Sequence, residues 1–191
     1  MAEEKTVYVP GYENDIFISY AQVNDKPLPG AKTGWVSELV RLLKIRLNEK
    51  LGRANSYFIW MDNKALRRNE LVTPDIDHQL RHSATFVFIL SEGYQASQWC
   101  QLELTTFLQM APSGTLFMVE YEPIEEKPLE TQELLGYRFW QRDEITERSS
   151  TLGMPIVQPT DVNYYTALDQ LATDLAKKLK QLKAEASPGR M

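Results

Sequence analysis

Trp99 and Glu103 are the two residues of this sequence best suited to hold and act on a ligand. Ser97 is a favoured N-cap residue, so we expect a helix to begin just before Trp99. Residues four apart on a helix share one face, which places the indole ring beside the carboxylate near the helix N-terminus. Such a pair could hold a planar, cationic or sugar-bearing ligand. Because this spacing also arises easily by chance, the surrounding elements must decide what it means.

Two further groups of side chains could carry chemistry. His78 and His82 lie four residues apart on one predicted helix, with Asp75 and Asp77 nearby, and this spacing could bind a metal. We favour a solvated helix face and predict no metal site, because the sequence offers no evident third ligand. Cys100 is interpreted as a small core residue rather than a nucleophile.

Familiar nucleotide-binding and hydrolase motifs are absent from the sequence. It contains no G-x-x-x-x-G-K-[ST] phosphate loop and no G-x-G-x-x-G after the first predicted strand. It also lacks the G-x-S-x-G nucleophile elbow. These absences argue against a P-loop hydrolase, a dinucleotide-binding Rossmann domain and an α/β-hydrolase.

Length and composition fit one globular domain. The chain has 191 residues, of which 43% are hydrophobic and 25% are charged, and its net charge is −5. The negative charge argues against nucleic acid or an anionic membrane as a partner. No apolar run approaches the roughly 20 residues that span a bilayer. A single cysteine excludes an internal disulfide and favours a reducing, cytoplasmic location.

Strands alternate with helices along the sequence. Apolar runs predict strands at residues 15–20, 57–61, 85–90, 115–120 and 137–140. Helical spacing of apolar residues predicts helices that begin near Trp35, Pro74, Ser97 and Tyr164. This alternation predicts right-handed βαβ units around a parallel sheet of five strands. An extended segment is also expected at residues 154–159.

Ligands of such folds bind in the loops at the carboxyl ends of the strands. The corresponding loops here are residues 21–34, 63–72 and 91–98, and Trp99 and Glu103 adjoin the third. The predicted site therefore lies at the edge of the sheet that carries ligands in this class of fold.

We expect three segments along the chain. Residues 1–13 are predicted to form a flexible N-terminal arm, residues 14–184 the folded domain, and residues 185–191 a C-terminal tail or linker. The composition of the tail suggests that a sensor domain or a partner protein lies beyond it.

A series of residues shares its order and spacing with a known family. The series comprises residues 15–20, Trp35, residues 59–62, Leu66, Ser83, residues 87–91, Tyr94, Ser97, Trp99, Cys100, Glu103 and Leu104. It resembles the TIR (Toll/interleukin-receptor) domain of the bacterial type. The match covers residues 14–120, and residues 121–184 fit the family's remaining elements more loosely.

This resemblance implies a flavodoxin-like α/β fold, with a five-stranded parallel sheet and helices on both faces. Glu103 aligns with the glutamate on which NAD⁺-cleaving members depend, and Trp99 aligns with the aromatic residue one turn before it. The substrate-binding residues that it implies are Trp99, Tyr20, Ala21, Asp62, Leu66 and Arg67. The loop after the second strand would serve in assembly through Leu66, Arg67, Arg68 and Asn69.

One carboxylate is enough for the implied reaction. Nicotinamide leaves NAD⁺ as a neutral molecule and needs no general acid, whereas ordinary glycosidases use two carboxylates. Glu103 could accept hydrogen bonds from ribose hydroxyls and stabilise the oxocarbenium-like transition state, and Trp99 could form a wall of the pocket. We therefore predict an NAD⁺ glycohydrolase that needs no cofactor. Its products would be nicotinamide and ADP-ribose or a cyclic variant, its activation would come through self-association, and its role would be antiphage defence.

Two segments depart from the pattern of NAD⁺-cleaving relatives. Basic residues directly after the first strand are replaced by Ala21 and Gln22, and the acidic residue after the loop leucine is replaced by Arg67. These differences bear on the product and on phosphate contacts. The principal rival to an enzyme is a non-catalytic scaffold that acts through TIR–TIR contacts. A nucleoside deoxyribosyltransferase is a further candidate, and an effector that acts in a host cell is the rival to the defence role.

Overall fold

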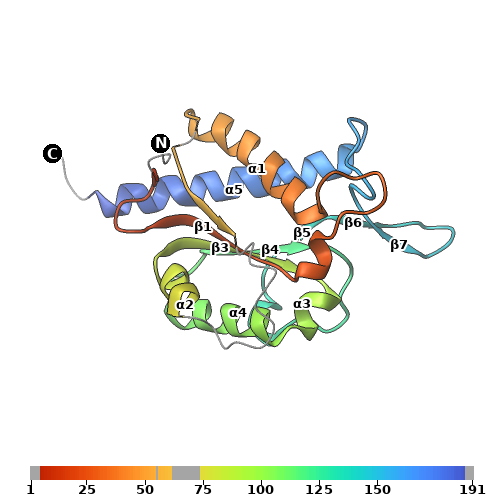
Figure 1. Cartoon of the computed structure of the whole chain (residues 1–191), viewed down its shortest axis with the longest axis horizontal. Helices are drawn as coiled ribbons and strands as arrows, with labels where there is room; N and C mark the ends of the chain where they lie inside the picture. The colour runs from red at the N-terminus through yellow and green to blue at the C-terminus, as the bar shows by residue number, and fades with distance from the viewer. Residues whose placement is uncertain (1–4, 55, 62–73, 188–191) are drawn as a thin grey trace.

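The structure is a computed structural model that describes residues 5–54, 56–61 and 74–187 (Figure 1). Its centre is a five-stranded parallel sheet with the strand order β2-β1-β3-β4-β5. The strands are β1 (Asn14–Ser19), β2 (Ile59–Met61), β3 (Ser83–Leu90), β4 (Leu116–Glu120) and β5 (Tyr137–Arg138). This strand order is that of the flavodoxin-like fold, which confirms the predicted fold class.

Helices cover both faces of the sheet (Figure 1). Two long helices lie on one face, α1 (Trp35–Leu51) and α5 (Val162–Ala186). The opposite face carries α2 (Pro74–Arg81), α3 (Glu92–Ala96) and α4 (Gln98–Met110). Two short 3₁₀ helices, η1 (Gln22–Asp25) and η2 (Leu129–Thr131), lie in loops.

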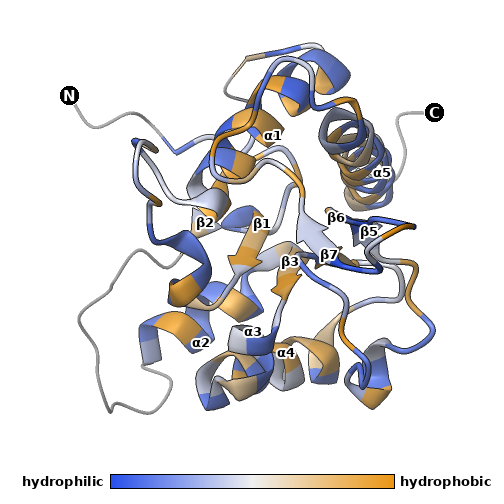
Figure 2. Ribbon diagram, turned by 90° about the vertical axis from the view of Figure 1, so that its right-hand side faces the viewer, coloured by the Kyte–Doolittle hydropathy of each residue, from blue (hydrophilic) through white to orange (hydrophobic). Residues whose placement is uncertain are grey.

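The central strands are buried on both faces, as their uninterrupted apolar runs predict. Alternate residues of β1 point to opposite layers, so Ile16 and Ile18 pack towards α1 and α5, and Phe17 packs towards α2 and α4. Figure 2 shows the hydrophobic strands β1 and β3 between the two helical layers. This burial fixes the register of β1 and therefore the position of Ser19 at its carboxyl end.

Several elements differ from the sequence-based predictions. The predicted fifth strand is divided into β5 and β6 (Trp140–Arg142), and β6 forms an antiparallel hairpin with β7 (Ser149–Thr151). The hairpin is mostly exposed, so it carries none of the apolar periodicity by which strands are predicted. The segment at residues 154–159 contains no strand.

The amino-terminal segment packs against the domain over its described part. Residues 5–13 belong to the predicted flexible arm, yet Val9 is fully buried in the core between the sheet and α5. Lys183 of α5 places its Nζ 4.1 Å from the centre of the Tyr8 ring, a cation–π contact. Neither contact is visible in the local sequence, because each joins residues far apart in the chain.

The helices of the described residues are all too short or too polar to cross a bilayer.

Candidate functional site

Glu103 lies on the buried side of α4 and is 3% exposed. Its Oε2 accepts a hydrogen bond of 2.5 Å from the hydroxyl of Ser19, the last residue of β1. The carboxylate therefore reaches the carboxyl end of β1. Glu103 lies within the buried stripe of α4, with Cys100, Leu104 and Phe107, and the Ser19 hydroxyl compensates the burial of its carboxylate.

The place of the Glu103 carboxylate in the sheet bears on whether it can meet a ligand. In sheets with this strand order, ligands bind outside the carboxyl ends of β1 and β3, where the chain connections turn to opposite sides. Ser19 ends β1 and Ser91 directly follows β3, and both are buried at that edge. Glu103 thus belongs to the part of the fold in which a ligand is expected.

A hydrogen-bond network joins Glu103 to the segments that follow β1 and β3. The hydroxyl oxygen of the fully buried Tyr94 lies 3.0 Å from Ser19 Oγ, and this hydroxyl donates to the carbonyl of Cys100 at 3.2 Å. The Ser91 hydroxyl accepts from the backbone N–H of Tyr94 and donates to Asn24 Oδ1 at 2.6 Å. The network holds α3, η1 and β1 together around the carboxylate.

Burial also decides the roles of two reactive-looking groups in this network. It raises the pKa of the Cys100 thiol to about 12, so the sulfur is protonated at neutral pH and is a poor nucleophile. Burial likewise raises the pKa of Tyr94 well above its ordinary value, which leaves its hydroxyl neutral and able to donate. The interpretation of Cys100 as a core residue agrees with this placement.

The remaining predicted site residues are only partly brought together. Trp99 is half-buried against the apolar layer beneath the sheet, and Tyr20 is half-buried against the opposite layer. Ala21 is 6% exposed, directly follows Tyr20 after β1, and belongs to the apolar layer against which Trp99 packs. The predicted residues Asp62, Leu66, Arg67, Arg68 and Asn69 lie outside the described residues. Among the described residues, therefore, Glu103 and Ala21 are the predicted site residues buried at the ligand-binding edge.

The 3₁₀ helix η1 follows β1 at this edge and packs against α3 and α1. A Cβ atom on Gly93 of α3 would lie 2.5 Å from Val23 Cγ2 and 3.3 Å from Ala21 Cβ, so η1 packs directly against α3. Asp25 ties η1 to α1 by accepting from the backbone N–H and the hydroxyl of Ser37, both at 2.7 Å. Because Glu103 is 3% exposed, a ligand can reach its carboxylate only when a covering group moves.

Ser19 and Asn24 are site residues that the sequence-based reasoning did not name. A signal for Ser19 was present, because a hydroxyl residue that ends a buried parallel strand lies at the ligand edge. Asn24 carries no comparable local signal, since its partner Ser91 is 67 residues away.

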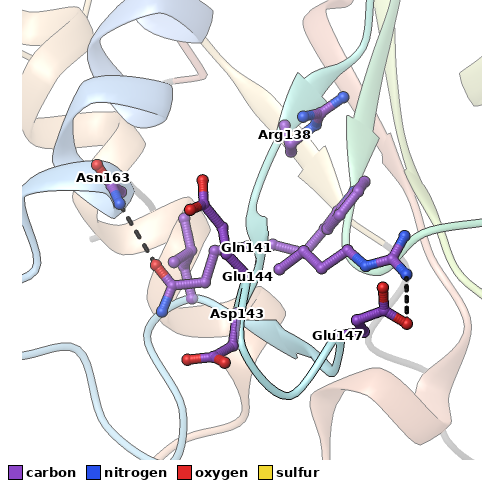
Figure 3. Close-up of a pocket in the computed structure, with 9 residues that line it drawn as sticks. Arg138, Gln141, Asp143, Glu144, Glu147 and Asn163 are labelled. Atoms are coloured by element: carbon purple, nitrogen blue, oxygen red, sulfur yellow. Dashed lines mark hydrogen bonds and ion pairs between the residues drawn. The ribbon is translucent and has the colours of Figure 1, made fainter.

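A cavity of about 680 Å³ lies elsewhere, beside the β6–β7 hairpin (Figure 3). Its lining combines the ion pair of Arg142 with Glu147, at 3.9 Å, and a hydrogen bond from Asn163 to Gln141, at 3.4 Å. Its charges are mixed and Glu103 is not among its lining residues. We therefore place the candidate site at Glu103 and not in this surface cavity.

Removal of the Tyr94 hydroxyl tests the network. Tyr94→Phe should lower the free energy of unfolding by about 1–2 kcal/mol, because the carbonyl of Cys100 loses the buried hydroxyl that donates to it and Ser19 loses a polar neighbour. Urea unfolding followed by circular dichroism measures the change. Tyr165→Phe, at the exposed surface of α5, is the matched control and should change stability by less than about 0.5 kcal/mol. Equal effects of the two variants would contradict a structural role for the network.

Comparison with known proteins relates this arrangement to one family. The family model described as "TIR domain" matches residues 16–152. No curated protein sequence matches the chain.

Solved structures that resemble the chain include a flavoprotein and two structures of TIR domains. The diflavin flavoprotein A3 from Nostoc sp. is 15% identical with a TM-score of 0.50, and the alignment covers 91% of this chain and 98% of that chain. The TIR domain of the Toll-related receptor TRR-2 from Hydra magnipapillata is 14% identical with a TM-score of 0.44, over 66% of this chain and 84% of that one. The TIR domains of the activated Roq1 resistosome are 15% identical with a TM-score of 0.40, over 89% and 83% of the respective chains.

Proposed function

The chain belongs to the TIR-domain family, and from this premise we propose that it is an NAD⁺ glycohydrolase with Glu103 as its catalytic carboxylate. The family includes NAD⁺-cleaving enzymes and non-catalytic scaffolds. One observation carries the proposal: a buried carboxylate on the helix after β3 meets the carboxyl end of β1, where this fold binds ligands.

The surroundings of the other buried carboxylates support this choice. Within the described residues, two more carboxylates are buried, Asp15 and Glu120. Asp15 lies at the opposite edge of the sheet and accepts from backbone N–H groups. Glu120 pairs with Lys127 at 2.5 Å and accepts from the indole of Trp140 at 3.2 Å, which suits a structural tie. Glu103 combines burial with the ligand-binding edge and a hydroxyl partner that a ribose hydroxyl could replace.

The reaction breaks the bond between the anomeric carbon of ribose and the nicotinamide nitrogen. The bonding electrons go to the nicotinamide, which leaves neutral, and positive charge develops on the ribose ring. The Glu103 carboxylate stabilises this charge and accepts hydrogen bonds from ribose hydroxyls in place of Ser19. Water then attacks the anomeric carbon and releases one proton, which gives ADP-ribose; attack by an adenine nitrogen instead gives a cyclic product.

Activity should depend on self-association, because Glu103 is only 3% exposed in the single chain and a substrate must first reach it. Contacts between TIR domains would stabilise an open, ordered pocket that the isolated domain seldom forms. We place Leu66, Arg67, Arg68 and Asn69 in this assembly contact. The proposed setting is antiphage defence, with NAD⁺ as substrate and a clustering sensor domain or partner.

The experiment incubates the purified chain with NAD⁺ over a wide range of protein concentrations and identifies the products by mass spectrometry. Specific activity should rise at least about tenfold across the range in which the chain self-associates, because assembly favours the open state. A response that stays flat would contradict activation by assembly. The absence of nicotinamide release even from a chain fused to an oligomerising domain would contradict the enzyme itself.

The low exposure of Glu103 favours a second candidate, a scaffold that acts through TIR–TIR contacts without catalysis. In that case Glu103 and Ser19 only fix α4 against β1. The same experiment separates the two functions, because a scaffold self-associates over this range of concentrations without releasing nicotinamide.

A further inference from the structure

Glu13, His78 and His82 form a cluster of potential metal ligands at the edge of the sheet opposite Glu103. Glu13 immediately precedes β1, His78 is on α2, and His82 directly follows this helix. One ligand atom from each residue lies within 4.8 Å of the other two. The two imidazole rings are stacked, with their centres 4.0 Å apart. Glu13, 65 positions before His78, therefore supplies the third ligand that the local sequence pattern lacks.

Backbone hydrogen bonds hold the segment of Glu13 against the end of α2. The carbonyl of His82 accepts from the backbone N–H groups of Glu13 and Asn14, at 2.9 and 3.0 Å. The side-chain amide of Asn14 donates to the carbonyl of Gln79 at 3.2 Å and to its side chain at 2.9 Å. The cluster is thus set by main-chain contacts and does not depend only on the positions of exposed side chains.

The hydrogen bonds also determine which ring nitrogens can bind a metal. His82 Nδ1 lies 2.8 Å from the carbonyl oxygen of His78, which can only accept, so Nδ1 carries the proton and Nε2 offers a lone pair. An imidazole whose second nitrogen donates to a carbonyl is the usual arrangement at metal centres. His78 Nε2 lies 3.0 Å from Glu13 Oε1, the pair of atoms between which a cation would bind.

We propose that Glu13, His78 and His82 bind a divalent first-row transition metal of the Zn²⁺ class. Two imidazole nitrogens with one carboxylate oxygen are a common protein ligand set for Zn²⁺ and leave one coordination position for water. Nitrogen ligands favour Zn²⁺, Co²⁺ and Ni²⁺ over Mg²⁺ and Ca²⁺, which prefer oxygen.

The distances need only a small adjustment to coordinate a metal. Bonds of about 2.1 Å at a tetrahedral angle separate two ligand atoms by about 3.4 Å. His78 Nε2 and Glu13 Oε1 are 3.0 Å apart, and a ring nitrogen of His82 belongs to the same group of ligand atoms within 4.8 Å of one another. His78 and Glu13 are about half exposed, at 47% and 46%, so their side chains can rotate by the required ångström without disturbing the core.

Such a metal would tie the start of β1 to the end of α2. The site lies at the amino ends of β1 and β3, whereas Glu103 reaches the carboxyl end of β1, so the metal would take no part in NAD⁺ cleavage. Its effect would be to stabilise the attachment of α2 to the sheet. The inference therefore stands whether or not the chain cleaves NAD⁺.

Titration of the full chain, without a histidine tag, by Zn²⁺ tests the site by calorimetry. We expect one ion per chain, and a rise of about 5–10 °C in melting temperature at a hundredfold excess over the dissociation constant. Co²⁺ should give the visible absorption of a site with nitrogen ligands. An undetectable or non-stoichiometric association would overturn the proposal.

Conservative variants keep the fold while they remove ligands. His78→Gln retains a donor towards Glu13, and His82→Asn retains a donor towards the carbonyl of His78. Glu13→Gln removes one negative charge, and its matched control is Asp77→Asn, which removes one negative charge from α2 and no ligand of the cluster. Each ligand variant should weaken Zn²⁺ binding by at least about tenfold, and the control by less than about twofold. Equal losses in Glu13→Gln and Asp77→Asn would indicate diffuse electrostatic attraction and would overturn the site.

Discussion

Glu103→Gln is expected to abolish nicotinamide release from NAD⁺ while leaving the chain folded. Glutamine has the shape of glutamate, and its carbonyl oxygen can still accept the hydrogen bond from Ser19. It lacks the negative charge that would stabilise the oxocarbenium-like transition state. We expect the turnover rate to fall by about a thousandfold or more, and the loss should be in the chemical step. Nicotinamide release under single-turnover conditions measures it.

Two further variants show whether a loss of activity in Glu103→Gln comes from the missing charge. Glu103→Ala would also leave a cavity and an unpaired Ser19 hydroxyl, so its loss of activity could come from the fold. Glu92→Gln removes a carboxylate from the exposed surface of neighbouring α3 and should retain activity within about twofold, because charge at the surface is screened. Activity that persists in a folded Glu103→Gln chain would exclude Glu103 as the catalytic group, whatever other residue carries the reaction.

The sheet could be predicted from the sequence because its strands are buried on both faces. Residues 85–90 form an apolar run without alternation, and this pattern is typical of a central parallel strand. The boundaries of α1 also follow local rules: Trp35 begins the helix, and Gly52 ends it with a positive φ of 72°. By contrast, α3 has only five residues, with a capping hydrogen bond from the backbone N–H of Tyr94 to the Ser91 side chain, and is too short for periodicity to indicate it.

The candidate site could be predicted only in part, because its geometry depends on contacts between distant residues. The sequence identifies Glu103 through a family resemblance, but the partner of its carboxylate is Ser19, 84 residues earlier. The helical spacing of His78 and His82 is visible in the sequence, whereas Glu13 joins them only through the pairing of β1 with β3. Local patterns give the type of each side chain and its helix face; the sheet topology decides which of them meet.

Asp15→Ala should produce the largest loss of stability of any single change considered for this chain. The Asp15 side chain is fully buried and accepts from three backbone N–H groups, those of Tyr8, Val9 and Phe58, at 2.8 to 3.0 Å. Alanine would leave all three donors without this acceptor and detach the segments before β1 and β2. We expect the free energy of unfolding to fall by about 3–5 kcal/mol, measured by urea unfolding.

Asp15→Asn keeps the shape of the side chain and removes its charge. The difference in stability between the natural chain and this variant should therefore depend on pH. Burial raises the pKa of Asp15 above its ordinary value of 3.8, against the opposing effect of the backbone N–H donors. The folded chain therefore binds the proton more tightly than the unfolded chain. The stability from this linkage is fully present below 3.8 and is lost as the pH rises through the folded pKa. Asparagine does not titrate, so the stability advantage of the natural chain over Asp15→Asn should be larger in acid than at neutral pH. If the stability advantage of the natural chain instead grows from acid to neutral pH, the backbone N–H donors lower the pKa of Asp15 by more than burial raises it.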